Sequence, residues 1–168
     1  MNKVFYLASI SLLIFATSCK KDISCGISNP TVVATSNEIS YMQNYFSINN
    51  ITGLTQDPSG VFYKIDTAGT GTTPTLCSYI LVNYNAYRFG YGNPFDSNSD
   101  PNGISFLLGN LILGVRKVVP LVKSGSQVTM YIPPSLAYGS DIIRDQSGNV
   151  ILPANSYIKF EMTLMGVN

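Results

Sequence analysis

The sequence has no histidine and no tryptophan, and few of its side chains are charged. Asp, Glu, Lys and Arg make up 11% of the 168 residues, and the formal net charge is +1. Without histidine, Ser-His and Cys-His catalysis are excluded, and the scattered carboxylates give no metal-binding pattern. A net charge this close to zero does not attract nucleic acid. We therefore expect no metal, no cofactor and no nucleic-acid partner.

The N-terminus, MNKVFYLASISLLIFATSC, has the order of a secretory signal. Lys3 precedes an apolar run that ends at Phe15, and small residues separate this run from Cys19. Such a run is too short to remain as a membrane-spanning helix. FATSC resembles the lipobox of bacterial lipoproteins, in which the cysteine is acylated, although Phe15 and Ser18 are not its usual residues. We predict a signal peptide over residues 1–18.

The same reading predicts where the protein resides. Acyl chains on Cys19 would anchor the chain stably to a membrane. We expect a lipid-anchored protein of the cell envelope, on the periplasmic or the surface face of the outer membrane. The alternative is an ordinary signal peptide with Cys19 downstream of the cleavage site.

Residues 19–52 are predicted to be a lipid-anchored tether that contains a short helix. The first part of this segment lacks strand-like alternation. Apolar residues from Ile39 to Phe46 then recur near helical spacing, which predicts a helix at about 37–48 with Ser36 as its cap. This helix either packs on the domain or a partner chain, or remains a marginal helix within a linker.

Two cysteines remain if Cys19 is lipidated. Cys25 and Cys77 form an even pair in an oxidising compartment, and a bridge would join the tether to the domain. Equally, Cys77 is a small apolar residue on a strand and Cys25 a free thiol in the linker. We favour the absence of a disulfide.

The rest of the chain predicts an α+β fold built from strands and one helix. Apolar residues from Ile112 to Val122 recur at helical spacing, but Pro120 lies among them and Gly125 follows, so this helix must be short or kinked. Alternation of apolar and polar residues predicts the strands. These are GVFYKIDTAG, LCSYILVNYNAYRF, SFLLG, SQVTMYI and SYIKFEMTLMGVN.

Several blocks in this order resemble the FKBP-type peptidyl-prolyl cis-trans isomerases. They are VNYNAY, FDSN, ISFLLG, LILGV, IPPSLAYG and LPANSYIKF. The resemblance covers residues 53–168 and implies a half-wrapped antiparallel sheet of five or six strands around one short α-helix. It also implies a monomeric isomerase, or rotamase, that assists the folding of exported, proline-containing polypeptides.

The resemblance further implies an apolar pocket between the sheet and the helix. Asp96 would be its one carboxylate, and the hydroxyl of Tyr138 would lie over its mouth. The implied catalytic residues are Tyr84, Phe95, Asp96 and Tyr138, and the implied substrate-binding residues are Ile104, Leu111, Ile112, Val115, Ala137, Leu152 and Phe160.

Two departures from the family pattern leave a second function open. Val115 stands where the family usually has a tryptophan at the pocket floor. The loop after Gly139 is longer than usual and could fold over the mouth with Ile142 and Ile143. Both features favour the alternative, a weakly active or inactive peptide-binding module of chaperone type on a lipoprotein.

Overall fold

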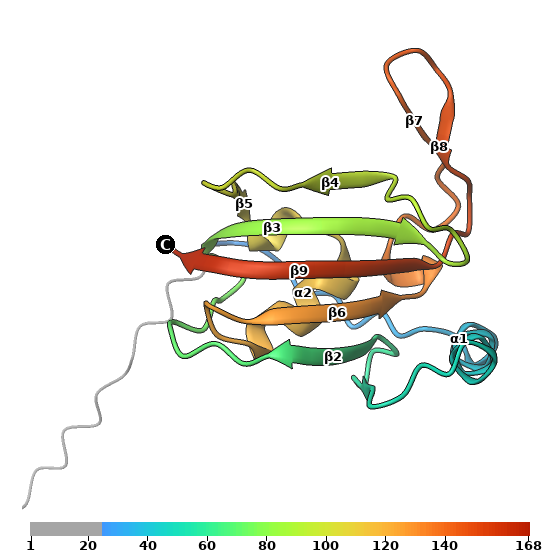
Figure 1. Ribbon diagram of the computed structural model, residues 1–168, viewed down its shortest axis with the longest axis horizontal. Coiled ribbons are helices and arrows are strands. Elements are labelled where there is room, and N and C mark those ends of the chain that lie inside the picture. The colour runs from blue at the N-terminus through green and yellow to red at the C-terminus, as the bar shows by residue number, and fades with distance from the viewer. Residues whose placement is uncertain (1–24) are drawn as a thin grey trace, which may run out of the picture.

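Two long strands form the centre of the computed structural model, which describes residues 25–168. They are β3 (Tyr79–Arg88) and β9 (Ile158–Val167), which pair antiparallel along their length. Alternate residues of each strand are apolar and buried, as the period of two in the sequence predicts. The buried face of both strands lies toward the helix behind the sheet in Figure 1.

Shorter strands complete the sheet on both sides of this pair. The strand order is β1-β2-β6-β9-β3-β4, every pairing is antiparallel, and β5 pairs with β3 beside β4. The predicted fold class is confirmed. The sheet has seven strands rather than five or six because β4 and β5 share one edge and β1 adds a short pair. The bounds are β1 (Thr55–Gln56), β2 (Phe62–Thr67), β4 (Asp96–Asn98), β5 (Ile104–Leu107) and β6 (Gln127–Ile132).

One short helix, α2 (Leu113–Val118), packs on the inner face of the sheet. A 3-10 turn, η2 (Val119–Leu121), follows it directly because Pro120 cannot continue the α-helical hydrogen bonding. A Cβ at Gly114 would collide with the side chain of Ile132 on β6, so glycine permits the close approach of helix and sheet.

A second helix, α1 (Ser36–Ile48), packs on the domain rather than remaining in a free linker. Its buried residue Phe46 contacts Phe62 of β2 and Tyr131 of β6, with ring centroids 5.1 and 4.9 Å away. The predicted cap was wrong by one residue: Thr35, not Ser36, caps the helix, because its side chain accepts a hydrogen bond from the Glu38 amide. Within residues 25–168, neither helix has the length and apolar character needed to cross a bilayer.

The segment before α1 lies along the domain, and the cysteine prediction was wrong. Cys25 and Cys77 form a disulfide with their Cα atoms 5.6 Å apart. The ammonium group of Lys117 donates a hydrogen bond to the carbonyl oxygen of Pro30 at 2.8 Å, which helps to hold residues 25–35 against α2. These tertiary contacts bring the two cysteines together, and their spacing in the sequence could not reveal this. Cys19 and the predicted signal peptide lie outside the described residues.

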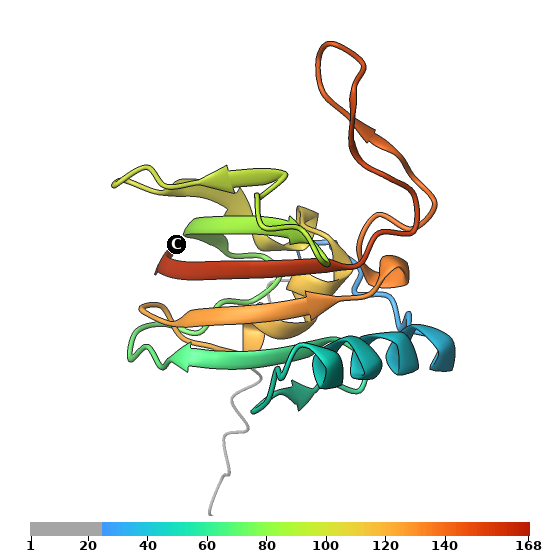
Figure 2. The ribbon, with the colours of Figure 1, turned by 45° about the vertical axis from the view of Figure 1, so that its right-hand side comes forward.

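The long loop after Gly139 forms a hairpin that stands away from the sheet (Figures 1 and 2). Its strands β7 (Ile143–Arg144) and β8 (Val150–Leu152) pair only with each other. Half of the Ile142 side chain is exposed. The loop does not close over the inner face as the sequence had suggested.

Candidate active site

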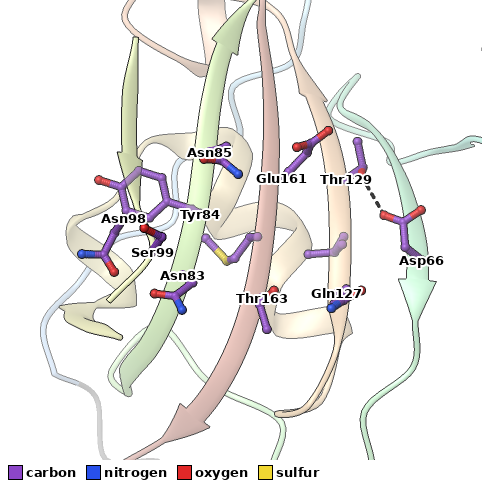
Figure 3. Close-up of a pocket in the computed structure, with 12 residues that line it drawn as sticks. Asp66, Asn83, Tyr84, Asn85, Asn98, Ser99, Gln127, Thr129, Glu161 and Thr163 are labelled. Atoms are coloured by element: carbon purple, nitrogen blue, oxygen red, sulfur yellow. Dashed lines mark hydrogen bonds between the residues drawn. The ribbon is translucent and has the colours of Figure 1, made fainter. Parts of the chain in front are cut away.

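A broad hollow on the outer face of the sheet is lined mostly by polar side chains. It has a volume of about 510 Å³. Figure 3 shows the side chains that line it projecting from neighbouring strands, with the hydroxyl of Thr129 donating to Asp66 at 2.6 Å. An antiparallel sheet commonly presents such a face to water. The outer hollow therefore offers hydrogen-bonding groups but no enclosed apolar surface.

Another hollow lies on the inner side of the fold, between the sheet and α2, and is mostly apolar. Its volume is about 200 Å³. Two hydroxyl groups and one carboxylate are the only polar side-chain groups among its lining residues. These residues are Val82, Tyr84, Asp96, Phe106, Leu111, Ile112, Val115, Tyr138, Phe160 and Met162.

Aromatic rings from three strands form one wall of this pocket. Tyr84 of β3 stacks on Phe160 of β9, with centroids 5.1 Å apart and planes at 14°. Phe106 of β5 lies 6.2 Å from Tyr84 at a tilt of 58°. All three side chains point to the inner face, because each sits in the alternation that buries its strand. The wall is thus fixed by strand register rather than by a loop.

A hydrogen bond links the wall to the one carboxylate at the pocket. The Tyr84 hydroxyl donates to Oδ2 of Asp96 at 2.9 Å. Burial raises the pKa of Tyr84 to about 12, and the hydrogen bond to Asp96 and its negative charge add to this effect. The Tyr84 hydroxyl therefore keeps its proton at neutral pH and holds the carboxylate at the edge of the pocket.

A second hydroxyl approaches the pocket from the turn after β6. Pro133 and Pro134 end the strand, and the 3-10 turn η3 (Pro134–Leu136) leads to Tyr138. Burial, with the charge of Asp96 as a second cause, raises the pKa of Tyr138. No residue from 25 to 168 forms a hydrogen bond with this hydroxyl, so it remains able to donate to a ligand in the pocket.

The structure brings together seven of the eleven residues implied for the site. The other four do not line the pocket. Phe95 is half-buried, and its amide donates to the carbonyl of Ala86 at 2.8 Å. Ile104 and Ala137 pack against the main core, and Leu152 is fully buried. Ile142 and Ile143 are also absent from the lining.

Three lining residues were missed. Val82, Phe106 and Met162 each lie two residues along a strand from another inward-facing residue. Because side chains on a strand alternate between its two faces, the period of two in the sequence predicts that these residues also face inward.

Comparisons with known proteins agree with this geometry. Residues 71–165 match the FKBP-type peptidyl-prolyl cis-trans isomerase family. The isomerase FkpA of Buchnera aphidicola (Acyrthosiphon pisum strain) is 31% identical over 129 residues, which cover 76% of this chain and 49% of that protein. The peptidyl-prolyl cis-trans isomerase Mip of Coxiella burnetii is 31% identical over 119 residues, covering 70% and 49%. The chain thus spans about half the length of these curated relatives.

Solved structures share the fold. The crystal structure of FkpA from Escherichia coli is 27% identical with a TM-score of 0.64, and the match covers 79% of this chain and 59% of that one. A peptidyl-prolyl cis-trans isomerase from Pseudomonas syringae pv. tomato has a TM-score of 0.65 at 21% identity, covering 83% and 99%.

Proposed function

Because the chain belongs to the FKBP-type peptidyl-prolyl cis-trans isomerase family, we propose that it catalyses rotation about X-Pro bonds in polypeptides. The observation that carries this proposal is the inner pocket. An apolar hollow of about 200 Å³ has one carboxylate and two tyrosine hydroxyls among its lining residues. A prolyl ring is apolar, and the amide bond before it is polar, so this division of the pocket suits an X-Pro unit.

The chemistry needs no covalent intermediate. Rotation about an amide has a barrier of ~18–20 kcal/mol, because the twisted bond loses resonance. The planar amide is the more polar form, and removing it from water destabilises it relative to the twisted form. A pocket that holds the ring and excludes water thus favours the twisted state over the ground state, which is the condition for catalysis.

Each part of the pocket has a proposed role. Leu111, Ile112 and Val115 would contact the prolyl ring from the side of α2, opposite the aromatic wall. The Tyr138 hydroxyl would donate to a substrate carbonyl oxygen. Asp96, held by Tyr84, would place its charge beside the twisting amide carbon. Groups already oriented in this way add stabilisation without reorganising during the reaction.

A protease-coupled assay on the full-length chain tests this proposal. A chromogenic X-Pro peptide is cleaved only in its trans form, so catalysed isomerisation accelerates the slow phase of cleavage. We expect acceleration that grows linearly with protein concentration. Binding of the peptide without acceleration would reject the isomerase and support the peptide-binding chaperone module instead.

We also propose that the protein acts in the cell envelope, anchored by acyl chains on Cys19, and serves exported polypeptides as a monomer. The signal-like N-terminus supports export, and the Cys25–Cys77 disulfide is typical of oxidising compartments outside the cytoplasm. Cys19→Ser should abolish partition into a detergent phase. Ser18→Ala, which keeps a small residue before the cysteine, should still partition. If Cys19→Ser partitions like the parent, the anchor is wrong.

A further inference from the structure

A single carboxylate joins α1 to the turn that carries Tyr138. Oε1 of Glu38 accepts the backbone N–H of Ser135 at 2.9 Å, and Oε2 accepts the Ser135 hydroxyl at 3.0 Å. The same Oε2 accepts the amide and the hydroxyl of Thr35 at 2.8 and 3.0 Å. Glu38 thus completes the helix cap and at the same time binds a residue that is 97 positions away in the chain.

The Ser135 N–H is a donor that the turn itself cannot satisfy. The first amides of a helical turn have no partner within the turn. Pro133 and Pro134 carry no N–H, so Ser135 supplies the first backbone donor of η3. Tyr138 follows three residues later, and Leu136 between them is fully buried. The turn is therefore fixed by Leu136 from inside and by Glu38 from outside.

Glu38 is well placed to hold this turn, because its own helix is firmly docked. Met42 and Phe46, one and two turns further along α1, are buried against the domain. Burial alone would raise the pKa of Glu38, but hydrogen bonds from Ser135 and Thr35 outweigh it and lower that pKa. The carboxylate is therefore charged at neutral pH, when its hydrogen bonds are strongest.

We propose that Glu38 is a positioning residue for the isomerase pocket: it holds the 133–139 turn so that the Tyr138 hydroxyl lies over the mouth. This inference rests on the proposed function and deepens it. It assigns the N-terminal segment, which lies outside the family match at 71–165, a part in shaping the site. The competing explanation is that Glu38 serves only to cap α1.

Four variants separate these explanations. Glu38→Ala removes both the cap and the link to Ser135. Thr35→Val removes the hydroxyl that caps α1 and with it one hydrogen bond to Oε2, but the Thr35 amide and both Ser135 donors still hold the Glu38 carboxylate. Ser135→Ala removes one of those two bonds and leaves the cap intact. Glu38→Gln keeps the length and an acceptor oxygen, and should restore part of any loss.

Two measurements on the full-length chain give the readout. Amide hydrogen exchange reports the Ser135 N–H without reference to activity, and peptide kinetics report the pocket. We expect Glu38→Ala to speed exchange at Ser135 about tenfold and to lower kcat/KM about fivefold, mostly through kcat. Ser135→Ala should shift both quantities in the same direction by less. Thr35→Val should leave both near the parent values while lowering the melting temperature.

The outcomes are distinct. If Thr35→Val lowers kcat/KM as much as Glu38→Ala does, Glu38 is only a cap and the proposal fails. Unchanged exchange at Ser135 in Glu38→Ala also overturns it. If Glu38→Ala does not fold, Ser135→Ala decides, because it spares the cap. An inactive parent would refute the isomerase, whereas the exchange data would still accept or reject the link between Glu38 and the turn.

Discussion

Removing the charge of Asp96 should slow isomerisation while leaving the fold almost unchanged. Asp96→Asn keeps the shape of the side chain and an oxygen that can accept a hydrogen bond from the Tyr84 hydroxyl. In the parent protein this hydroxyl lies 2.9 Å from Oδ2 of Asp96. Asp96 itself is exposed, and only the short strand β4 carries it. The substitution therefore tests the charge and disturbs little packing.

The expected size follows from electrostatics at the edge of the pocket. A unit charge about 4 Å from another interacts by ~1 kcal/mol in water and ~4 kcal/mol at an effective dielectric constant of 20. The twisting amide carries only partial charge, and Asp96 is open to solvent, so the lower part of this range applies. We expect kcat/KM to fall about tenfold, which corresponds to ~1.4 kcal/mol. A neutral hydrogen bond in place of a charged one should cost about 1 kcal/mol of stability.

The assay is the protease-coupled measurement on parent and variant, beside thermal unfolding. Asp100→Asn is the matched control, since Asp100 is an exposed aspartate in the next turn that does not line the pocket. It should keep the parent rate. If Asp96→Asn also keeps the parent rate, or if both variants lower the rate equally, the charge of Asp96 does not act on the substrate. A large fall in melting temperature with unchanged kcat/KM would make Asp96 a residue of the turn alone.

Three further predictions concern stability and the pocket floor. Tyr84 and Tyr131 have pKa values raised to about 12 in the folded protein, whereas the same tyrosines lose their protons near pH 10 in the unfolded chain. The stability of the fold should therefore hold up to about pH 10 and fall between pH 10 and 12. Thermal melts across this range should show a less steep fall in Tyr84→Phe. Replacing both Cys25 and Cys77 by serine removes a crosslink between residues 52 positions apart and should lower the free energy of unfolding, measured with denaturant, by about 2–4 kcal/mol. An unchanged denaturation midpoint would mean that the disulfide does not form. Val115→Trp should place an indole at the floor and raise peptide affinity or turnover in a folded protein; a lower rate would mean that the 200 Å³ pocket already fits its substrate.

Periodicity predicted the parts of the fold in which one face of an element is buried. The alternation along LCSYILVNYNAYRF placed Ile80, Val82 and Tyr84 on one face, and the structure puts them inward on β3. The helix after Ile112 was expected to be short because of Pro120, and it is. In these segments the local pattern and the tertiary packing favour the same structure, so the sequence alone was sufficient to predict it.

The N-terminal segment could not be predicted, because its structure depends on contacts far along the chain. Lys117 holds Pro30 from α2, and the disulfide joins Cys25 to Cys77. Neither partner is recognisable from its neighbours in the sequence. Thr35 followed by Glu38 is a capping-box pattern and was visible, but its second role at Ser135 depends on the folded turn.

The two polar sides of the pocket are fixed in different ways, and this makes them separable by experiment. Phe160 lies opposite Ala86 in the sheet, and Ala86 lies opposite Asp96, so one row across β9, β3 and β4 sets both the wall and the carboxylate. A slip of one residue would turn these side chains to the outer face. The positions of Phe160 and Asp96 therefore cannot change unless the sheet itself is rearranged. Tyr138 instead depends on a turn held by Leu136 and Glu38, so its position can change while the sheet remains intact.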